Sequence, residues 1–496
     1  MILTIDLGSS ATKAALWAHD RLVAVGRAPL RTLYGDGGIV EQKPSDWWGS
    51  VVEACSRARE GKPAFEDVDG IAMSAARQTF VPVDGSGFPL GPGILWSDRR
   101  ASKEATEIAE KFGGSSSVHR RTGTILDGAS VSAKFAWLET HERERFENAR
   151  WMLAPRDVML HRMTGIVATD DTLASATGLY DLDGKLVPWI SDSATEKLPE
   201  SVAPVTVIGP LLAEPSAELG VSQGVPVVIG AGDRPSEVVG AGASSERAMV
   251  SWGTTANLSL PIGAKPLGEA EGLSLTRAAL DGWLLEGGLS AAGSLVSWLE
   301  KLTNTAGAEL MEMARACPEG ARGVVVAPWA GGARAPWWRD GARAGVIGLS
   351  LDHGAGEVAR AVVEAVAWDV RRCMDAVRTV TLAKAVGPID HGGDGVSRPR
   401  IESLALTGSG TRSSLWVDVV TAVSGLRAVV RRSGEAASAG AAIVGSSALG
   451  SGFELDRIDP IVERVTPSRD SVKRYEELRP AIDRTASTLV DLVFES

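Results

Sequence analysis

The sequence is poor in cysteine and lacks the patterns typical of a disulfide scaffold or a zinc site. Its three cysteines, Cys55, Cys317 and Cys373, lie far apart among 496 residues and form no CxxC pair. An odd number of scattered cysteines argues against a disulfide framework and fits a reducing compartment. The six histidines do not cluster with cysteines at metal-ligand spacing, which argues against a structural zinc.

Long apolar runs and an excess of positive charge are also missing. No stretch of about 18 uncharged apolar residues occurs, so we predict no membrane span. The first residues, MILTID, already read as a buried strand and leave no room for a secretory signal. The formal net charge is −11, which argues against a nucleic-acid-binding surface spread over the chain. We therefore expect a cytoplasmic protein that binds neither nucleic acid nor a membrane.

What the chain does have is length and an alternation of strand and helix patterns. With 496 residues it is too long for one ordinary core, so two domains are expected. Apolar strands such as GVPVVIGAG alternate with helical stretches, among them residues 132–147 and 414–425. We predict an α/β fold with domains at residues 1–243 and 244–496. The Gly/Pro-rich segment 388–400 is expected to be an exposed loop.

Each half of the chain opens with a similar strand–turn–strand pattern. TIDLGSSATKAAL and VSWGTTANLSL both place a glycine and two hydroxyl residues between apolar strands. Glycine lets a ligand approach the backbone, and successive N–H groups with hydroxyls suit a phosphate. An ordinary hairpin turn explains either copy alone, whereas two copies would hold one polyphosphate from both sides. The candidate phosphate-binding residues are Gly8, Ser9, Ser10, Thr12, Lys13, Gly253, Thr254 and Thr255.

The two copies differ at one acidic position. Asp6 stands two residues before Gly8, where the second copy has Ser251. An acid inside an apolar strand is costly unless it is paired. A single carboxylate beside phosphates is what a Mg²⁺ ion needs, often through its waters. An acid flanking a turn is the alternative reading, and we predict that Asp6 serves Mg²⁺.

The segment LALTGSGTRSSLW combines a strand, a glycine turn and the start of a helix. Such turns at the carboxyl ends of strands are favoured nucleotide sites in α/β sheets. It is not a GxGxxG dinucleotide fingerprint, and no GxxxxGK[ST] P-loop occurs in the chain, which argues against an NAD-type or Walker-type site. The candidate nucleotide-binding residues here are Gly408, Ser409, Gly410 and Arg412.

Residues 76–100 carry polar groups that suit a polyhydroxylated ligand. Arg77 and Gln78 follow a strand of small residues, and Trp96 and Asp98 follow another apolar run. A tryptophan stacks on C–H faces, while the other three side chains hydrogen-bond hydroxyls. A surface hairpin with a salt-bridged pair is an equally good reading of these residue types.

Asp233 follows the apolar strand PVVIG and directly precedes Arg234 and Pro235. One hypothesis makes it the N-cap of the next helix, because a proline near the first turn suits that place. The other makes it a general base that accepts a hydroxyl proton as the oxygen attacks a phosphoryl group. The small residues of GAG would let a ligand lie close to the backbone, which a cap does not explain. We favour the general base.

Together these segments resemble the FGGY family of carbohydrate kinases, in the sugar kinase/actin/Hsp70 superfamily, over essentially the whole chain. IDLGSSATKAALW and VSWGTTANLSL look like its two phosphate motifs, LTGSGTRSSLW like its adenosine motif and GAGDRPSEVVGAG like its catalytic-Asp segment. AGVIGLSLDHGAGEVARAVVE fits its C-terminal signature. The resemblance implies two ribonuclease-H-like (actin-like ATPase) domains with ATP and Mg²⁺ in the cleft between them, Asp233 as general base and Asp6 at the metal.

Within the family, EQKPSDWW and PGILWSDRRA look like xylulokinases, which implies a pentulose such as D-xylulose as substrate. The sugar would meet Arg77, Gln78, Trp96, Asp98 and Arg234. Arg77-Gln78 looks more like the Arg-Glu of glycerol kinases, and Arg234 replaces a neutral sugar contact.

Arginine suits bidentate recognition of anions, so a polyol or sugar acid is the alternative substrate. A non-catalytic ATP-binding module of the actin/Hsp70 type is a third reading. We expect a small-molecule sugar as partner and allow for a homodimer.

Overall fold

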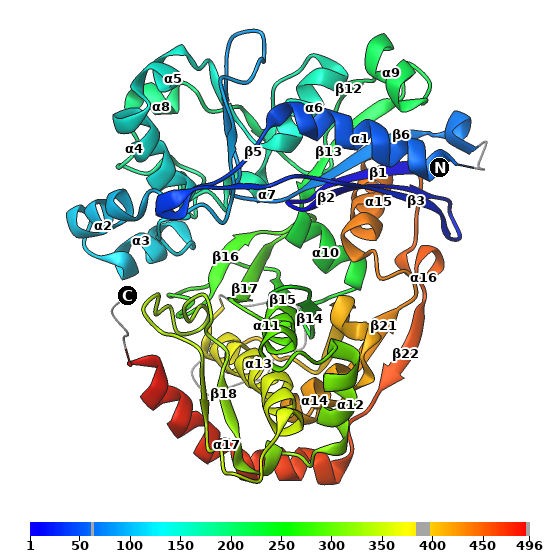
Figure 1. Ribbon diagram of the computed structural model, residues 1–496. Helices are drawn as coiled ribbons and strands as arrows, with labels where there is room; N and C mark the ends of the chain where they lie inside the picture. Colours follow the sequence, from blue (N-terminus) through cyan, green and yellow to red (C-terminus); the bar gives the residue numbers. More distant parts are fainter. Residues whose placement is uncertain (61–63, 383–396, 493–496) are drawn as a thin grey trace. The chain divides into compact units, whose positions relative to one another are not determined.

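The structure, a computed structural model, describes residues 1–60, 64–382 and 397–492 (Figure 1). Most of the predicted loop at 388–400 lies outside these residues. The chain forms two compact units. Unit 1 comprises Met1–Gly240, Leu275–Trp283 and Glu435–Pro460, and unit 2 comprises Ala241–Ser274, Leu284–Gly434 and Ile461–Ser496. Two segments from the second half of the chain thus pack in unit 1, and the division into 1–243 and 244–496 stays a prediction.

Unit 1 is built on a six-stranded sheet in the order β12-β13-β6-β1-β2-β3. β1 is antiparallel to β2 and parallel to β6, and β6 is parallel to β13. β1 and β6 are buried along their whole length, as expected of central strands that helices cover on both faces. The strands are β1 (Ile2–Leu7), β2 (Ala11–Trp17), β3 (Leu22–Pro29), β6 (Gly70–Ala75), β12 (Val207–Pro210) and β13 (Pro226–Gly232).

Two helices from opposite ends of the chain cover this sheet. α1 (Pro44–Arg59) packs on β2 and β3, and α15 (Ala436–Leu449) packs on β1, β2 and β6 (Figure 1). The strand period of two sends neighbouring side chains to opposite faces. Leu16 therefore joins the apolar cluster of α1, whereas Trp17 packs with α15 and donates from its indole Nε1 to Ser438 Oγ at 2.9 Å.

The segment between β6 and β13 holds short helices and strands. The single helix expected over 132–147 is wrong: α4 ends at His141 and α5 begins at Arg143, with Glu142 at φ −125° and ψ 50° between them. Phe146 nevertheless packs in the same cluster as Leu138, so the apolar pattern continues across the break and could not reveal it. The elements here are β7 (Val81–Val83), β8 (Gly93–Ile94), α2 (Ser102–Lys111), α3 (Ser115–Thr122), α4 (Val131–His141), α5 (Arg143–Asn148), β9 (Trp151–Leu153), α6 (Pro155–Thr164), β10 (Thr169–Asp170), α7 (Asp171–Ala174), α8 (Asp192–Thr195), β11 (Ser201–Val202) and α9 (Ala213–Leu219).

Unit 2 repeats the strand order of unit 1. Six strands of its sheet run β17-β15-β14-β20-β21-β22. β14 is antiparallel to β15 and parallel to β20, as β1 is to β2 and β6. The expected repeat of a strand–turn–strand unit is therefore confirmed, and it extends to the sheet around it. The strands are β14 (Arg247–Trp252), β15 (Ala256–Ile262), β17 (Trp283–Leu289), β20 (Ser403–Gly408), β21 (Arg427–Arg431) and β22 (Ile461–Val465).

Unit 2 also contains helices of 10 to 25 residues. α14 ends at Ser424, and Gly425 takes the left-handed conformation with a φ of 71°, as predicted for a helix ended by that glycine. The helices are α11 (Gly293–Thr303), α12 (Gly307–Ala316), α13 (Ala355–Thr379), α14 (Ser414–Ser424) and α17 (Arg469–Val490).

None of the helices in the described residues combines the length and the apolar character needed to cross a membrane. Cys55, Cys317 and Cys373 are all buried as free thiols.

Candidate active site

Asp233 lies in unit 1 where β13 passes into α10 (Asp233–Ala241). β13 carries a bulge, because its pairing with β6 shifts register between Val228 and Ala231. Gly230 in this bulge has a φ of 71°, and a Cβ there would lie 1.7 Å from the carbonyl oxygen of Met73. Only glycine fits such a position. A bulge bends its strand, so the bend at Gly230 decides where the strand places Asp233.

The carboxylate of Asp233 faces two arginines and is partly exposed. Its Oδ1 accepts a hydrogen bond from the backbone N–H of Arg234 at 2.7 Å and lies 4.0 Å from Arg77 Nε. Desolvation raises the pKa of Asp233, and the charges of Arg234 and Arg77 oppose that rise. The side chain keeps 41% of its surface exposed. Asp233 is thus the first residue of α10 and presents an accessible carboxylate, as the general-base hypothesis requires.

Asp6 on β1 is a buried carboxylate within electrostatic reach of Asp233. It is 7% exposed, and Ser74 Oγ donates to its Oδ1 at 3.0 Å. Burial raises the pKa of Asp6, the charge of Lys13 lowers it, and the charges of Asp233 and Glu237 raise it further. A buried charge among like charges is unfavourable. A divalent cation at Asp6 would relieve that repulsion.

Asp6 fits a magnesium ion held mainly by other groups. Within the described ranges, no set of three or more His, Cys, Asp or Glu side chains is arranged to hold a metal ion. Mg²⁺ usually keeps several waters and binds one or two carboxylates together with substrate phosphates. One buried carboxylate is therefore a sufficient protein contribution.

The first glycine-hydroxyl turn joins β1 to β2. Only some of its predicted phosphate-binding residues are accessible to solvent. Gly8 donates from its N–H to the carbonyl of Ala11 at 3.2 Å and closes the turn. Ser10 is exposed. Thr12 is fully buried, and its hydroxyl lies 2.6 Å from Ser50 Oγ. The remaining predicted residues are Ser9, which is half-buried, and Lys13, whose Nζ pairs with Glu435 at 3.3 Å.

Of the predicted sugar contacts, Arg77 and Arg234 lie beside Asp233. A Cβ on Gly232 would meet Arg77 Cγ at 2.6 Å, so the arginine packs directly over the residue before Asp233. Arg77 also donates from Nη1 to Thr276 Oγ1 at 3.3 Å. Arg234 forms an ion pair with Glu237 one turn along α10. The structure therefore brings both arginines to Asp233, and Glu237 compensates one of their charges.

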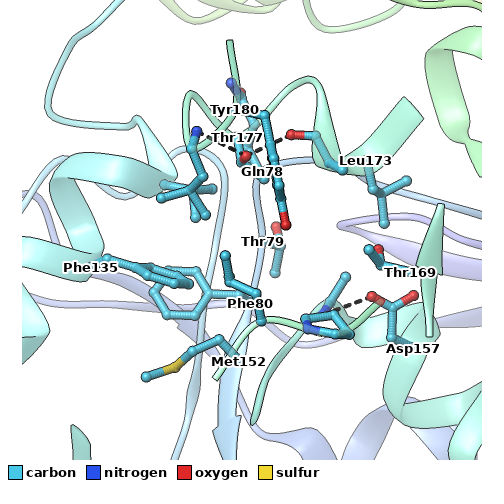
Figure 2. A pocket seen from close by; sticks show the side chains of 16 residues that line it. Gln78, Thr79, Phe80, Phe135, Met152, Asp157, Thr169, Leu173, Thr177 and Tyr180 are labelled. Atoms are coloured by element: carbon cyan, nitrogen blue, oxygen red, sulfur yellow. Dashed lines mark hydrogen bonds between the residues drawn. The ribbon is translucent and has the colours of Figure 1, made fainter. Parts of the chain in front are cut away.

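Gln78 is held in an unusual backbone conformation at the wall of a small cavity. Its φ is 58°, in the left-handed region, and its Nε2 donates to the carbonyl of Ala176 at 3.0 Å. The cavity is about 50 Å³ and is also lined by Phe135 and Tyr180 (Figure 2). Ligand pockets usually start near about 300 Å³, so the cavity in this structure is smaller than an ordinary ligand site.

Trp96 and Asp98 lie on the loop after β8. Asp98 is fully buried and accepts hydrogen bonds from the Val40 N–H at 2.6 Å and from Arg100 Nη2 at 2.7 Å. Trp96 is half-buried, and its backbone N–H donates to Thr79 Oγ1 at 3.0 Å. Asp98 therefore holds the loop in place through protein partners, and its contact with sugar stays a prediction.

Lys134 on α4 lies buried beneath the loop that carries Trp96 and was not predicted from the sequence. It is fully buried, and its Nζ donates to the carbonyl of Leu95, next to Trp96, at 2.6 Å. Burial lowers the pKa of Lys134 to about 7, although Asp98 and Asp127 favour its charged form. Lys134 therefore holds the loop of Trp96 through the Leu95 carbonyl. The free-energy cost of burying its charge depends on pH.

Replacing Lys134 with methionine is expected to change the pH dependence of stability. Between about 7 and its usual pKa of 10.5, the unfolded wild type binds more protons than the folded form, so wild-type stability rises with pH. The variant lacks this gain. The free energy of unfolding of wild type, relative to that of the variant, should therefore rise by up to about 1.4 kcal/mol per pH unit. Urea unfolding at pH 6.5 and pH 9 measures the difference. The exposed Lys103→Met serves as control, and a pH-independent difference for Lys134→Met would contradict the assignment.

In unit 2, the second glycine-hydroxyl turn and the turn after β20 line one pocket of about 510 Å³. Gly408 has a φ of 85°, and a Cβ there would lie 2.2 Å from the carbonyl oxygen of Trp252, so this turn requires glycine. Of the other predicted residues, Gly410 packs on Trp252, Thr255 is half-buried and Arg412 is exposed. The pocket is lined by the predicted Gly253, Thr254 and Ser409, and by Gly293, Ser294, Ser297, Trp298 and Lys301.

The sequence did carry a signal for the missed residues of this pocket. The segment GGLSAAGSLVSWLEK places glycine and serine at the start of α11 and a lysine two turns later. The N-terminus of a helix favours anions. The backbone N–H of Gly293 is taken by the carbonyl of Gly253 at 3.0 Å, which ties the start of α11 to the glycine-hydroxyl turn.

Two units with one repeated sheet topology, each opening on a glycine-hydroxyl turn, define an actin-like two-domain α/β protein. Models of the FGGY family of carbohydrate kinases match the chain twice: the N-terminal domain over residues 1–240 and the C-terminal domain over residues 248–449. The chain belongs to the FGGY family of carbohydrate kinases. It is therefore a phosphotransferase with an alcohol group as acceptor, its substrate is a small sugar, and the family implies ATP as the phosphoryl donor.

Known members of the family resemble the chain along its whole length. The gluconokinase of Bacillus subtilis (strain 168) is 26% identical over 97% of this chain and 94% of its own length. The xylulose kinase of Escherichia coli (strain K12) is 27% identical over 99% of this chain and 100% of its own. The ligand-bound crystal structure of xylulose kinase from Lactobacillus acidophilus superimposes with a TM-score of 0.87 at 21% identity, over 99% of both chains.

Proposed function

We propose that this kinase transfers the γ-phosphoryl group of ATP to a primary hydroxyl of a pentulose such as D-xylulose, with Asp233 as general base. The observation that carries the proposal is the carboxylate of Asp233, accessible at the end of a bulged strand and flanked by Arg77 and Arg234. The E. coli xylulose kinase, similar over the full length of both chains, supports the choice of substrate.

In the proposed reaction Asp233 accepts the proton of the sugar hydroxyl as its oxygen bonds to the γ-phosphorus. The bond from that phosphorus to the bridging oxygen breaks, ADP leaves and the proton passes from Asp233 to solvent. The pKa of Asp233 is raised by desolvation, which makes the carboxylate a stronger base. Asp6 would hold Mg²⁺, which when bound offsets negative charge on the phosphates.

We assign the phosphates to the glycine-hydroxyl turns and the adenosine to the turn after β20. Gly8, Ser9 and Ser10 provide the turn in unit 1. The pocket of unit 2, about 510 Å³, falls within the size range of ordinary ligand sites. Its walls combine two glycine turns with Lys301, a donor set that suits a polyphosphate.

The variant Gly253→Ala tests this assignment without disturbing the fold. Gly253 is exposed, its φ lies outside the left-handed region, and a Cβ there would meet no atom within 4 Å. Its stability should match the wild type, whereas KM for ATP should rise about tenfold, or about 1.4 kcal/mol, because the methyl group takes the space of a phosphate. Gly263→Ala, equally exposed and free of neighbours, is the control. An unchanged KM for ATP in Gly253→Ala would remove the turn from the site.

A sugar acid is the second candidate substrate. Arg77 could bind a carboxylate in a bidentate manner, and one similar protein is a gluconokinase. The arginines already have carboxylate partners, because Arg77 faces Asp233 and Arg234 pairs with Glu237. A sugar carboxylate would have to compete with these two side chains, which favours the neutral sugar.

A panel of D-xylulose, glycerol and D-gluconate, assayed by ADP release at saturating ATP and Mg²⁺, separates the candidates. The proposal predicts the highest kcat/KM for D-xylulose. A higher kcat/KM for D-gluconate would select the sugar acid and overturn the pentulose. The cytoplasmic location and the homodimer stay predictions.

A further inference from the structure

A chain of buried polar groups links α6, β10 and α7 to the strand that carries Asp233. Arg156, Asp170 and Thr172 are each fully buried. Arg156 Nη1 donates to Asp170 Oδ2 at 2.6 Å, and the hydroxyl of Thr172 donates to Asp170 Oδ1. Thr172 Oγ1 in turn accepts the backbone N–H of Gly232, the residue before Asp233, at 2.8 Å.

The direction of each hydrogen bond in this chain is fixed by chemistry. The guanidinium of Arg156 can only donate, so the Asp170 carboxylate must accept. Because the carboxylate also accepts from the Thr172 hydroxyl, the lone pairs of that hydroxyl are left for the N–H of Gly232. Asp170 also accepts the backbone N–H of Thr172 at 2.8 Å, which fixes the threonine on α7. Donors and acceptors in this series of hydrogen bonds can therefore be arranged in only one way.

The same groups hold the strand at a second point. Arg156 Nη1 lies 3.4 Å from the carbonyl oxygen of Gly230, the glycine of the bulge. Gly230 O and Gly232 N are thus both bound by the buried polar groups. Arg77 and Leu173 pack against Gly232, where a Cβ would lie 2.6 Å and 3.3 Å from them. The segment from Gly230 to Gly232 is held at both ends just before it delivers Asp233.

We propose that Arg156, Asp170 and Thr172 form a buried clamp that positions Asp233 for proton transfer. This inference rests on the proposed role of Asp233 as general base. The three residues touch no reacting atom, so they are positioning residues. An error of about 1 Å in the placement of a reacting group can cost about 100-fold in rate.

A buried ion pair is a costly way to stabilise a fold. Asp157 also pairs with Arg156, whose Nη2 donates to its Oδ1 at 2.7 Å, and Asp157 is itself buried. Apolar side chains of the same volume often serve a core equally well. These buried groups bind the Gly230 carbonyl and the Gly232 N–H, which lie just before Asp233 in the strand. A role in positioning Asp233 explains why the hydrogen bonds lead to these two backbone groups.

The test compares Thr172→Val with Thr172→Ser, assayed with ATP and whichever of D-xylulose and D-gluconate the panel selects. Valine keeps the shape and removes the hydroxyl, whereas serine keeps the hydroxyl. We expect valine to lower kcat about 10- to 100-fold with both KM values within about threefold, and serine to keep kcat within about threefold of wild type. Thr164→Val is the matched control, since Thr164 is a buried threonine of unit 1 whose hydroxyl also accepts a backbone N–H, that of Ile166 at 3.2 Å. Its kcat should stay within about twofold.

A double-mutant comparison separates positioning from a general loss of structure. In the Asp233→Asn background, Thr172→Val should change the residual rate by less than about twofold, because the group it positions is gone. If Thr172→Val lowers kcat by the same factor in both backgrounds, or leaves kcat at the wild-type value, the clamp is overturned. If Thr172→Val does not fold, Thr172→Cys replaces it: the thiol is a weak donor and acceptor, and kcat should fall several-fold. A wild-type kcat for the cysteine variant also overturns the clamp. Asp233→Asn alone near wild type would contradict the proposed base itself.

Discussion

Replacing Asp233 with asparagine is expected to lower kcat by about 100-fold or more, with KM for the sugar changed by no more than a few-fold. Asparagine keeps the shape of aspartate and cannot accept a proton at the working pH. General base catalysis contributes about 10²- to 10⁴-fold, so its loss should appear in kcat. Steady-state ADP release at saturating sugar measures the change.

Asp192→Asn is the matched control for Asp233→Asn. Asp192 opens α8 as Asp233 opens α10, and it is exposed. Its kcat should equal that of wild type. The raised pKa of Asp233 adds a second expectation: kcat/KM of wild type for the sugar should increase with pH through an acid limb that lies above 3.8, and Asp233→Asn should lack that limb. A kcat within a few-fold of wild type for Asp233→Asn would refute the assignment of the base.

Replacing Asp6 with asparagine is expected to abolish most activity and yet to stabilise the protein. The carboxylate of Asp6 is buried and repelled by Asp233 and Glu237, which raises its pKa above 3.8. Asparagine removes the charge and can still accept the hydrogen bond that Ser74 donates at 3.0 Å. A site that sacrifices stability for function gains stability when the functional group is removed.

The pH dependence of this gain has a definite sign. Because the pKa of Asp6 is raised in the folded protein, the folded form binds more protons than the unfolded chain between 3.8 and the raised value. The free energy of unfolding of wild type therefore falls as pH rises through that window. Asp6→Asn has no such loss, so its Tm should exceed that of wild type by more at pH 7 than at pH 4.

Thermal unfolding and steady-state kinetics of Asp6→Asn give the two readouts. We expect a kcat at least about 100-fold below wild type, since Asp6 would hold the metal that offsets phosphate charge. Asp20→Asn, an exposed carboxylate of unit 1 that pairs with its neighbour Arg21, should change neither quantity. A variant that is both fully active and less stable would show that Asp6 is an ordinary structural acid.

The parts of the fold that could be predicted from the sequence depend on residues that are close together in the chain. The two strand–turn–strand units show a glycine and two hydroxyls within a few residues, and both form antiparallel hairpins. Gly425 ends its helix because a left-handed residue is needed there. The position of Asp233 after an apolar strand is equally local.

What the sequence could not predict depends on contacts between distant segments. Residues 435–460 pack in unit 1, and no pattern within that segment of the sequence indicates this. The clamp joins Arg156, Asp170 and Thr172 to Gly232 across some 60 residues, and no periodicity connects them. Asp98 was predicted to contact sugar from its residue type alone, and the sequence did not reveal its hydrogen bonds to Arg100 and Val40.

The most direct test of the account is ³¹P NMR of the wild-type enzyme with ATP, Mg²⁺ and D-xylulose, with D-gluconate in a parallel sample. The account predicts one new phosphomonoester signal in the D-xylulose sample, equal in amount to the γ-phosphate lost and to the ADP formed. It also predicts that Asp233→Asn yields this signal about 100-fold more slowly or worse. Release of inorganic phosphate as the sole product, with no sugar phosphate in either sample, would contradict it.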